Sequence, residues 1–128
     1  MIVHQHHKWD VLNGEWVAQT EDGLVPVATR PIVGVAIMHL DYVRVMSEVA
    51  QHPPAEFPLQ HILETAFFHS SAYWASLAAD WVEAGAPLSS RLFERLKARA
   101  YAPGKYDPAA RRALLAHKAN ALAVEQPR

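Results

Sequence analysis

Cysteine is absent from this chain of 128 residues, and glycine occurs only five times. Without cysteine there is no disulfide framework, no thiolate metal site and no cysteine nucleophile. Three of the glycines stand in obvious turns, so little backbone is left for an oxyanion hole or a phosphate-binding loop. Because no Gly-x-Ser-x-Gly elbow is present either, the sequence argues against a serine hydrolase or a nucleotide-binding enzyme.

Long hydrophobic runs are also missing. The longest, residues 32–38, is too short to span a bilayer. The N-terminal residues MIVHQHHKWD have no basic region followed by an apolar one, so they do not predict a secretory signal. The composition, 51% apolar and 20% charged, is that of a globular protein. We therefore expect a single cytoplasmic domain over residues 1–128, with no membrane contact and no cofactor.

Charge is plentiful but unevenly distributed. Residues 1–88 carry ten acids and three bases, a balance of −7, whereas residues 89–128 carry nine bases and three acids, a balance of +6. The net charge of −1 therefore hides a dipolar molecule. A polarised surface of this kind indicates a charged partner that must be captured and oriented.

The first 28 residues predict a small β-hairpin or meander. Asn13-Gly14 separates two runs rich in β-formers, and both positions of such a turn favour φ > 0. Asp22-Gly23 repeats the signal, so two or three strands are expected within residues 8–28.

Residues 29–128 predict about five helices. A polar stripe with helical spacing marks the first of them, and it consists of Asp41, Arg44, Glu48 and Gln51. Residues 32–38 either extend this helix or form a buried strand, and we favour the helix. His52-Pro53-Pro54 ends it.

Two further helices are expected over residues 58–84, separated by a break near Ser70. Another begins after Ser89 or Ser90, and the last runs from Asp107-Pro108 to about Val124. Short connections favour stacked helical hairpins. The predicted fold class is mainly α (α+β).

Candidate catalytic or metal-binding sets are weak. His4, His6 and His7 resemble metal ligands, with His4 and His6 on one strand face, but Asp10 is the only nearby acid. On a single helix His61, Glu64 and His69 would not converge. Residues that could form a Ser-His-Asp hydrolase triad are present, but no nucleophile-elbow motif supports them; they are His69, Ser70, Ser71 and Asp80. We expect neither a metal site nor catalytic residues, and we expect Tyr73, Trp74 and Trp81 to belong to the core.

Basic residues at i, i+4 and i+8 predict a positive ridge near the C-terminus. It consists of Arg91, Arg95 and Arg99, and Arg111 extends it. Such a ridge is typical of a solvated helix face or of a nucleic-acid-binding surface. Nucleic acid is the less favoured partner, since the acidic remainder of the chain would repel it.

The segment SAYWASLAADWVEAG, residues 71–85, resembles a helix of small bacterial immunity proteins from contact-dependent growth inhibition and other polymorphic-toxin systems. The segment from Arg111 through HKANAL, which ends at residue 122, looks like the closing helix of their HEAT-like hairpin. The resemblance covers about residues 57–124 and implies a non-enzymatic protein that binds and neutralises a cognate toxin domain, often a nuclease.

For such an inhibitor, the acids are the expected toxin-binding residues, because nuclease toxins tend to be basic. The candidates are Asp41, Glu48, Glu56 and Glu64. Immunity proteins are often acidic overall and this chain is not, so an alternative is that its basic end meets an acidic patch of the toxin. A regulatory nucleic-acid-binding module with Arg91, Arg95, Arg99 and Arg111 is the alternative function.

Overall fold

The computed structural model describes residues 1–52, 55–104 and 107–125, with side chains to residue 121. It begins with a four-stranded antiparallel meander in the order β1-β2-β3-β4. Asn13 and Gly14 have φ values of 53° and 81°, and they join β2 to β3 as a two-residue turn inside the Leu12–Glu15 pair. The predicted hairpin is therefore confirmed. The strands are β1 (Ile2–His4), β2 (His7–Leu12), β3 (Glu15–Thr20) and β4 (Gly23–Pro26).

The sheet begins earlier than predicted. β1 pairs with β2, and His4 lies opposite His7 across a turn in which Gln5 has a φ of 53°. His6 lies in that turn, so the prediction that His4 and His6 share one face of a strand is wrong. Sequence reasoning missed this turn because neither of its residues is glycine, asparagine or aspartate, which are the residues that favour positive φ.

Residues 32–38 form neither a strand nor an extension of the following helix. They lie in a 3-10 helix, η1 (Pro31–His39), which packs against α2 (Leu59–Phe68) and α3 (Ala72–Glu83). Leu40 is extended, and Asp41 then starts a new helix, α1 (Tyr42–Val49), by accepting a hydrogen bond from the Arg44 amide. The residues are helical, as favoured, but the prediction that they extend the following helix is wrong, because the N-cap at Asp41 separates the two elements. Pro53 and Pro54, the predicted end signal, lie outside the described residues.

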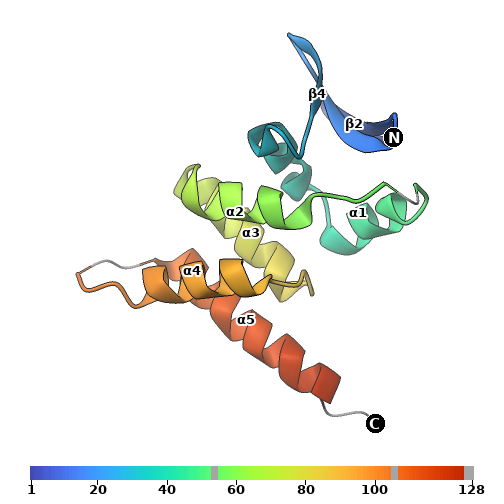
Figure 1. Ribbon diagram of the computed structural model, residues 1–128. Helices are drawn as coiled ribbons and strands as arrows, with labels where there is room; N and C mark the ends of the chain where they lie inside the picture. The colour runs from blue at the N-terminus through green and yellow to red at the C-terminus, as the bar shows by residue number, and fades with distance from the viewer. Residues whose placement is uncertain (53–54, 105–106, 126–128) are drawn as a thin grey trace.

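The remaining helices form two stacked hairpins, as expected for a mainly α (α+β) fold. α2 packs on α3, α3 packs on α5, and α4 packs on α5 (Figure 1). The Ser89 hydroxyl caps the fourth helix through the Leu92 amide, and the Asp107 carboxylate caps the fifth through the Ala110 amide. The break at Ser70 is also confirmed. The bounds are α2 (Leu59–Phe68), α3 (Ala72–Glu83), α4 (Ser90–Ala100) and α5 (Pro108–Glu125).

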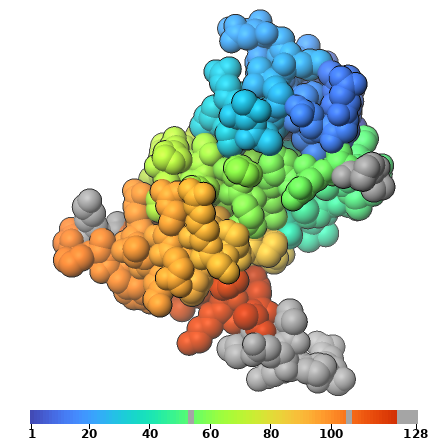
Figure 2. Space-filling model, in the orientation of Figure 1, coloured from blue at the N-terminus to red at the C-terminus, as the bar shows by residue number. Residues whose placement is uncertain are grey.

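The sheet is fixed to η1 by the indole of Trp9 and by the surrounding apolar core, and a second indole joins α3 to the segment between η1 and α1. Trp9 Nε1 donates to the Val33 carbonyl at 2.9 Å, and Trp81 Nε1 donates to the Leu40 carbonyl at 3.0 Å. The chain order is preserved in space, so the sheet lies at one end of the molecule and α5 at the other (Figures 1 and 2). Within the described residues no helix is long and apolar enough to cross a membrane.

Candidate functional site

Most acids of residues 1–58 have charges that no ion pair within the described residues compensates; Asp10, which lies 3.7 Å from the N-terminal amine, is the exception. Asp41 and Glu56 are exposed, and Glu48 is half-buried on α1. Only Lys8, Arg30 and Arg44 supply positive side chains over residues 1–58. Within the described residues, the acids of this part that form no ion pair are Glu15, Glu21, Asp22, Asp41, Glu48 and Glu56.

Glu64, the fourth predicted toxin-binding acid, is placed differently. Its Oε1 accepts from Arg91 Nη2 at 3.2 Å and also from Arg95 Nη1. The Glu64 side chain is 21% exposed, and the pairs join α2 to α4. Glu64 therefore stabilises the contact between α2 and α4, whereas Asp41 is an exposed acid at the start of α1.

The predicted basic ridge is also bonded within the fold. The guanidinium groups of Arg95 and Arg99 lie 4.2 and 5.2 Å from the centre of the Phe68 ring, within cation–π range. Arg99 Nε lies 3.3 Å from Asp107 Oδ2, and Arg111 Nε donates to the Ala100 carbonyl at 3.3 Å. A nucleic acid would have to compete with these contacts for Arg95, Arg99 and Arg111. Residue spacing alone gave no sign of the Phe68 partner.

Arg112 connects α5 to α3, a role that the sequence analysis did not assign. Its Nη2 donates to Glu83 Oε1 at 2.5 Å and to Asp80, and its Nη1 donates to Ser76 Oγ at 3.2 Å. The hydrogen bond from Arg112 lowers the pKa of Glu83, and the same carboxylates raise the pKa of Arg112. This cluster stabilises the contact between the two helical hairpins.

The hydrolase candidates are not assembled. Asp80 is bonded to Arg112, and the Ser70 hydroxyl donates to the Ala66 carbonyl at 2.6 Å. Over the described part of the chain, no three histidine, aspartate or glutamate side chains converge on a metal position.

Histidines and aromatic rings gather where the sheet meets the helices. His4 of β1 stacks on His39 of η1 with ring centres 5.1 Å apart, and His39 contacts Trp74 edge-on at 4.9 Å. The Tyr73 hydroxyl lies 3.3 Å from His39 Nδ1. Burial lowers the pKa of His39, and the nearby His4 and His7 lower it further.

Only part of the aromatic prediction is confirmed. Trp81 is fully in the core, and Trp74 is half-buried against it. Tyr73 is 55% exposed, so its assignment to the core is wrong. Its place at the first turn of α3 directs it towards the exposed ring of His39 instead of inwards.

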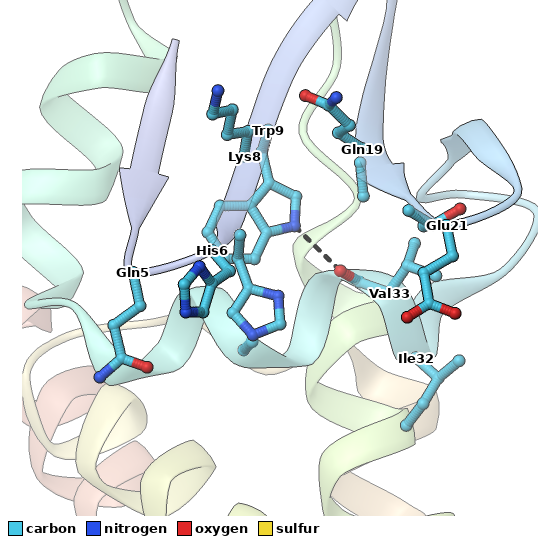
Figure 3. A pocket seen from close by; sticks show the side chains of 12 residues that line it. Gln5, His6, Lys8, Trp9, Gln19, Glu21, Ile32 and Val33 are labelled. Atoms are coloured by element: carbon cyan, nitrogen blue, oxygen red, sulfur yellow. Dashed lines mark hydrogen bonds between the residues drawn. The ribbon is translucent and has the colours of Figure 1, made fainter.

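A cavity of about 670 Å³ lies between the sheet and η1 (Figure 3). Trp9 and Val33 form its apolar floor, and the figure shows the Trp9 indole directed at the Val33 carbonyl. Polar side chains surround this floor, among them His6, Lys8 and Glu21. The charged side chains at the cavity have both signs, positive at Lys8 and negative at Glu21.

A second cavity, about 510 Å³, lies between α4 and α5, and we refer to it as the α4–α5 groove. It combines apolar and basic side chains, and the charged members of its described lining are all positive. The sequence analysis missed it because it arises only when the two helices are packed together. The lining residues are Phe93, Lys97, Tyr101, Arg111, Leu114, Leu115, His117 and Lys118.

No protein-family model, curated protein or solved structure matches this chain.

Proposed function

We propose that this protein is a non-catalytic inhibitor of the immunity-protein class, which binds a basic toxin domain in the cytoplasm through its acidic end. One observation carries the proposal. Most acids of the helical hairpins are neutralised inside the fold: Glu64, Asp80, Glu83 and Asp107 pair with arginines, and among the described side chains of the hairpins only Glu94 does not. The acids near the sheet and α1, such as Asp41 and Glu48, have no such partner in the described residues.

An acidic end of this kind suits a nuclease toxin, because a protein that binds phosphates presents positive charge at its active site. Complementary charge accelerates encounter and fixes the orientation of the two proteins. A stoichiometric inhibitor requires a stable surface and no reacting groups. The paired histidine and arginine clusters serve that purpose by holding the sheet and the hairpins in place.

A growth assay tests the function. The proposal expects the gene immediately upstream to encode a large secreted protein with a toxic C-terminal domain, and this domain is induced in a host with and without this chain; an upstream gene with no toxin-like product would remove the proposal. The proposal expects growth arrest alone, rescue on co-expression, and a one-to-one complex on purification. Arrest that this chain does not relieve would remove the proposal. A nucleic-acid-binding protein would instead show no rescue and an affinity for nucleic acid that falls steeply with salt.

The binding end is tested with a variant that preserves the fold. Asp41→Asn retains an N-cap side chain, and Glu48→Gln removes the second charge of α1. We expect this pair to slow association with the toxin domain by about tenfold at low salt, since charges at an interface act mainly on the association rate. Stopped-flow mixing measures that rate.

Glu94→Gln is the matched control, because Glu94 is an exposed acid of α4 at the opposite end, with no ion pair in the described residues. The control should associate at the wild-type rate. If the Asp41/Glu48 variant is folded and associates as fast as the control, the α1 surface is not the binding surface.

A further inference from the structure

The α4–α5 groove has the composition of a binding site for an acidic segment with an apolar side chain. Phe93 and Leu114 are partly buried beneath it, while Tyr101 and Leu115 are each 71% exposed at its border. Exposed aromatic and aliphatic groups beside a cavity are typical of protein-binding surfaces. The groove therefore supplies apolar contact area that the fold itself leaves uncovered.

The charge of the groove specifies its occupant more closely. Lys97 and Lys118 are exposed, and within the described residues neither forms an ion pair. Arg111 adds a third positive group while its Nε is held by the Ala100 carbonyl. Several cations around one apolar floor favour a ligand with more than one carboxylate.

The same chain has such a segment at its other end. The β3–β4 turn, residues 20–24, presents Glu21 and Asp22 next to Leu24, which is 56% exposed. The Thr20 hydroxyl donates to the Gly23 carbonyl at 2.8 Å and accepts from the Asp22 amide at 3.1 Å. These bonds order the turn before binding, so little conformational entropy is lost when it enters a groove.

We propose that the α4–α5 groove binds the β3–β4 turn of a second copy of this chain. The sheet and α5 lie at opposite ends of the molecule, so a turn cannot reach its own groove (Figures 1 and 2). Carboxylates of Glu21 and Asp22 meet Lys97 and Lys118, and Leu24 covers Phe93. Because the two contacting surfaces differ, the contact is head-to-tail and can add further copies.

The contact is small and charge-dependent, so the association is weak and reversible. Sedimentation of the full chain at low salt, from about 10 µM to about 1 mM, should show a mass that rises with concentration. Salt at about 0.5 M should return the protein to a monomer, because it screens exposed charges. A wild-type chain that stays monomeric over this range at low salt overturns the proposal.

Two variants locate the surfaces. One carries Glu21→Gln with Asp22→Asn and keeps the groove, and the other carries Lys97→Glu with Lys118→Glu and keeps the turn. Each alone should self-associate at least about tenfold more weakly than the wild type. Mixed, they should form a heterodimer and stop there, because only one intact turn and one intact groove remain.

A charge-matched control, Glu15→Gln with Glu56→Gln, removes two acids that lie outside the turn and should associate as the wild type does. If this control is impaired as strongly as the turn variant, net charge drives association and the assigned turn is wrong. A mixture of the turn and groove variants that remains monomeric also overturns the head-to-tail contact.

Discussion

At the scale of single residues, Gly34 shows why the apolar run of residues 32–38 contains a glycine. A Cβ at this position would lie 2.7 Å from Val27 Cγ1 and 3.0 Å from Ile62 Cδ1. Val27 follows the last strand and Ile62 belongs to α2, and both are fully buried. The missing side chain therefore lets η1 approach the end of the sheet and α2 together.

Gly34→Ala should destabilise the protein by about 1–3 kcal/mol, since the added methyl overfills a packed interior. Urea unfolding at equilibrium measures the loss. Val27→Ala alone should also destabilise, through the cavity that it leaves. In the double variant the new methyl occupies that space, so the combined loss should fall short of the sum by about 1 kcal/mol. Strictly additive losses would show that Val27 is not the obstacle.

At the scale of elements, the parts that sequence predicts well are those whose cause is local. The Asn13-Gly14 turn, the Ser89 cap and the Asp107 cap each depend on a few adjacent residues, and all three lie where expected. The start of α1 at Asp41 was less evident, because the apolar run before it shares the preference for helix. When a residue that can cap a helix lies in the middle of a helical pattern, the packing on either side decides whether a new helix begins there.

The parts that sequence missed depend on contacts between distant elements. Glu64 meets Arg91 and Arg95 only because α2 packs beside α4, and Phe68 lies under Arg95 for the same reason. Helical spacing correctly places these arginines on one ridge. It does not reveal that the ridge faces an acid of another helix. The sequence analysis therefore assigned Glu64 and the arginines to two different candidate sites, whereas the fold pairs them.

Glu64→Gln tests this clasp between α2 and α4. The Glu64 carboxylate is largely covered and serves two guanidinium groups, so its neutralisation should cost about 1 kcal/mol of the free energy of unfolding. Glu94→Gln on the exposed side of α4 is the control and should change stability by less than about 0.5 kcal/mol. The difference should shrink at high salt. Equal stability of the two variants would mean that the clasp contributes nothing.

At the scale of the whole molecule, the fold converts a linear charge asymmetry into a spatial one. The chain runs from the sheet through η1 to the two hairpins, so the unpaired acids near the sheet and α1 lie away from α5 (Figure 1). Acids of residues 1–88 that lie in the hairpins then pair with arginines of the basic part, as Asp80 and Glu83 do with Arg112. The acidic end and the α4–α5 groove remain as the two surfaces of opposite sign.

The junction between the sheet and the helices should make stability depend on pH. His39 packs against His4 of β1 and against Tyr73 and Trp74 of α3, with His7 of β2 nearby, and its pKa is lowered in the folded state. The unfolded chain therefore binds a proton at this residue at a higher pH than the folded chain does. The contribution of His39 to the free energy of unfolding is fully present above the ordinary histidine pKa range, and it is lost as the pH falls towards the lowered pKa.

His39→Gln should flatten this dependence, as measured by urea unfolding at several pH values between about 8 and 5. His61→Gln, on the exposed side of α2, is the control and should keep the wild-type slope. Because the imidazole of His39 is shared between the sheet and α3, its protonation acts on the attachment of one end of the molecule to the other. A wild-type slope in His39→Gln would place the pH dependence elsewhere, and would leave the indole of Trp9 and the apolar core as the contacts that hold the sheet in place.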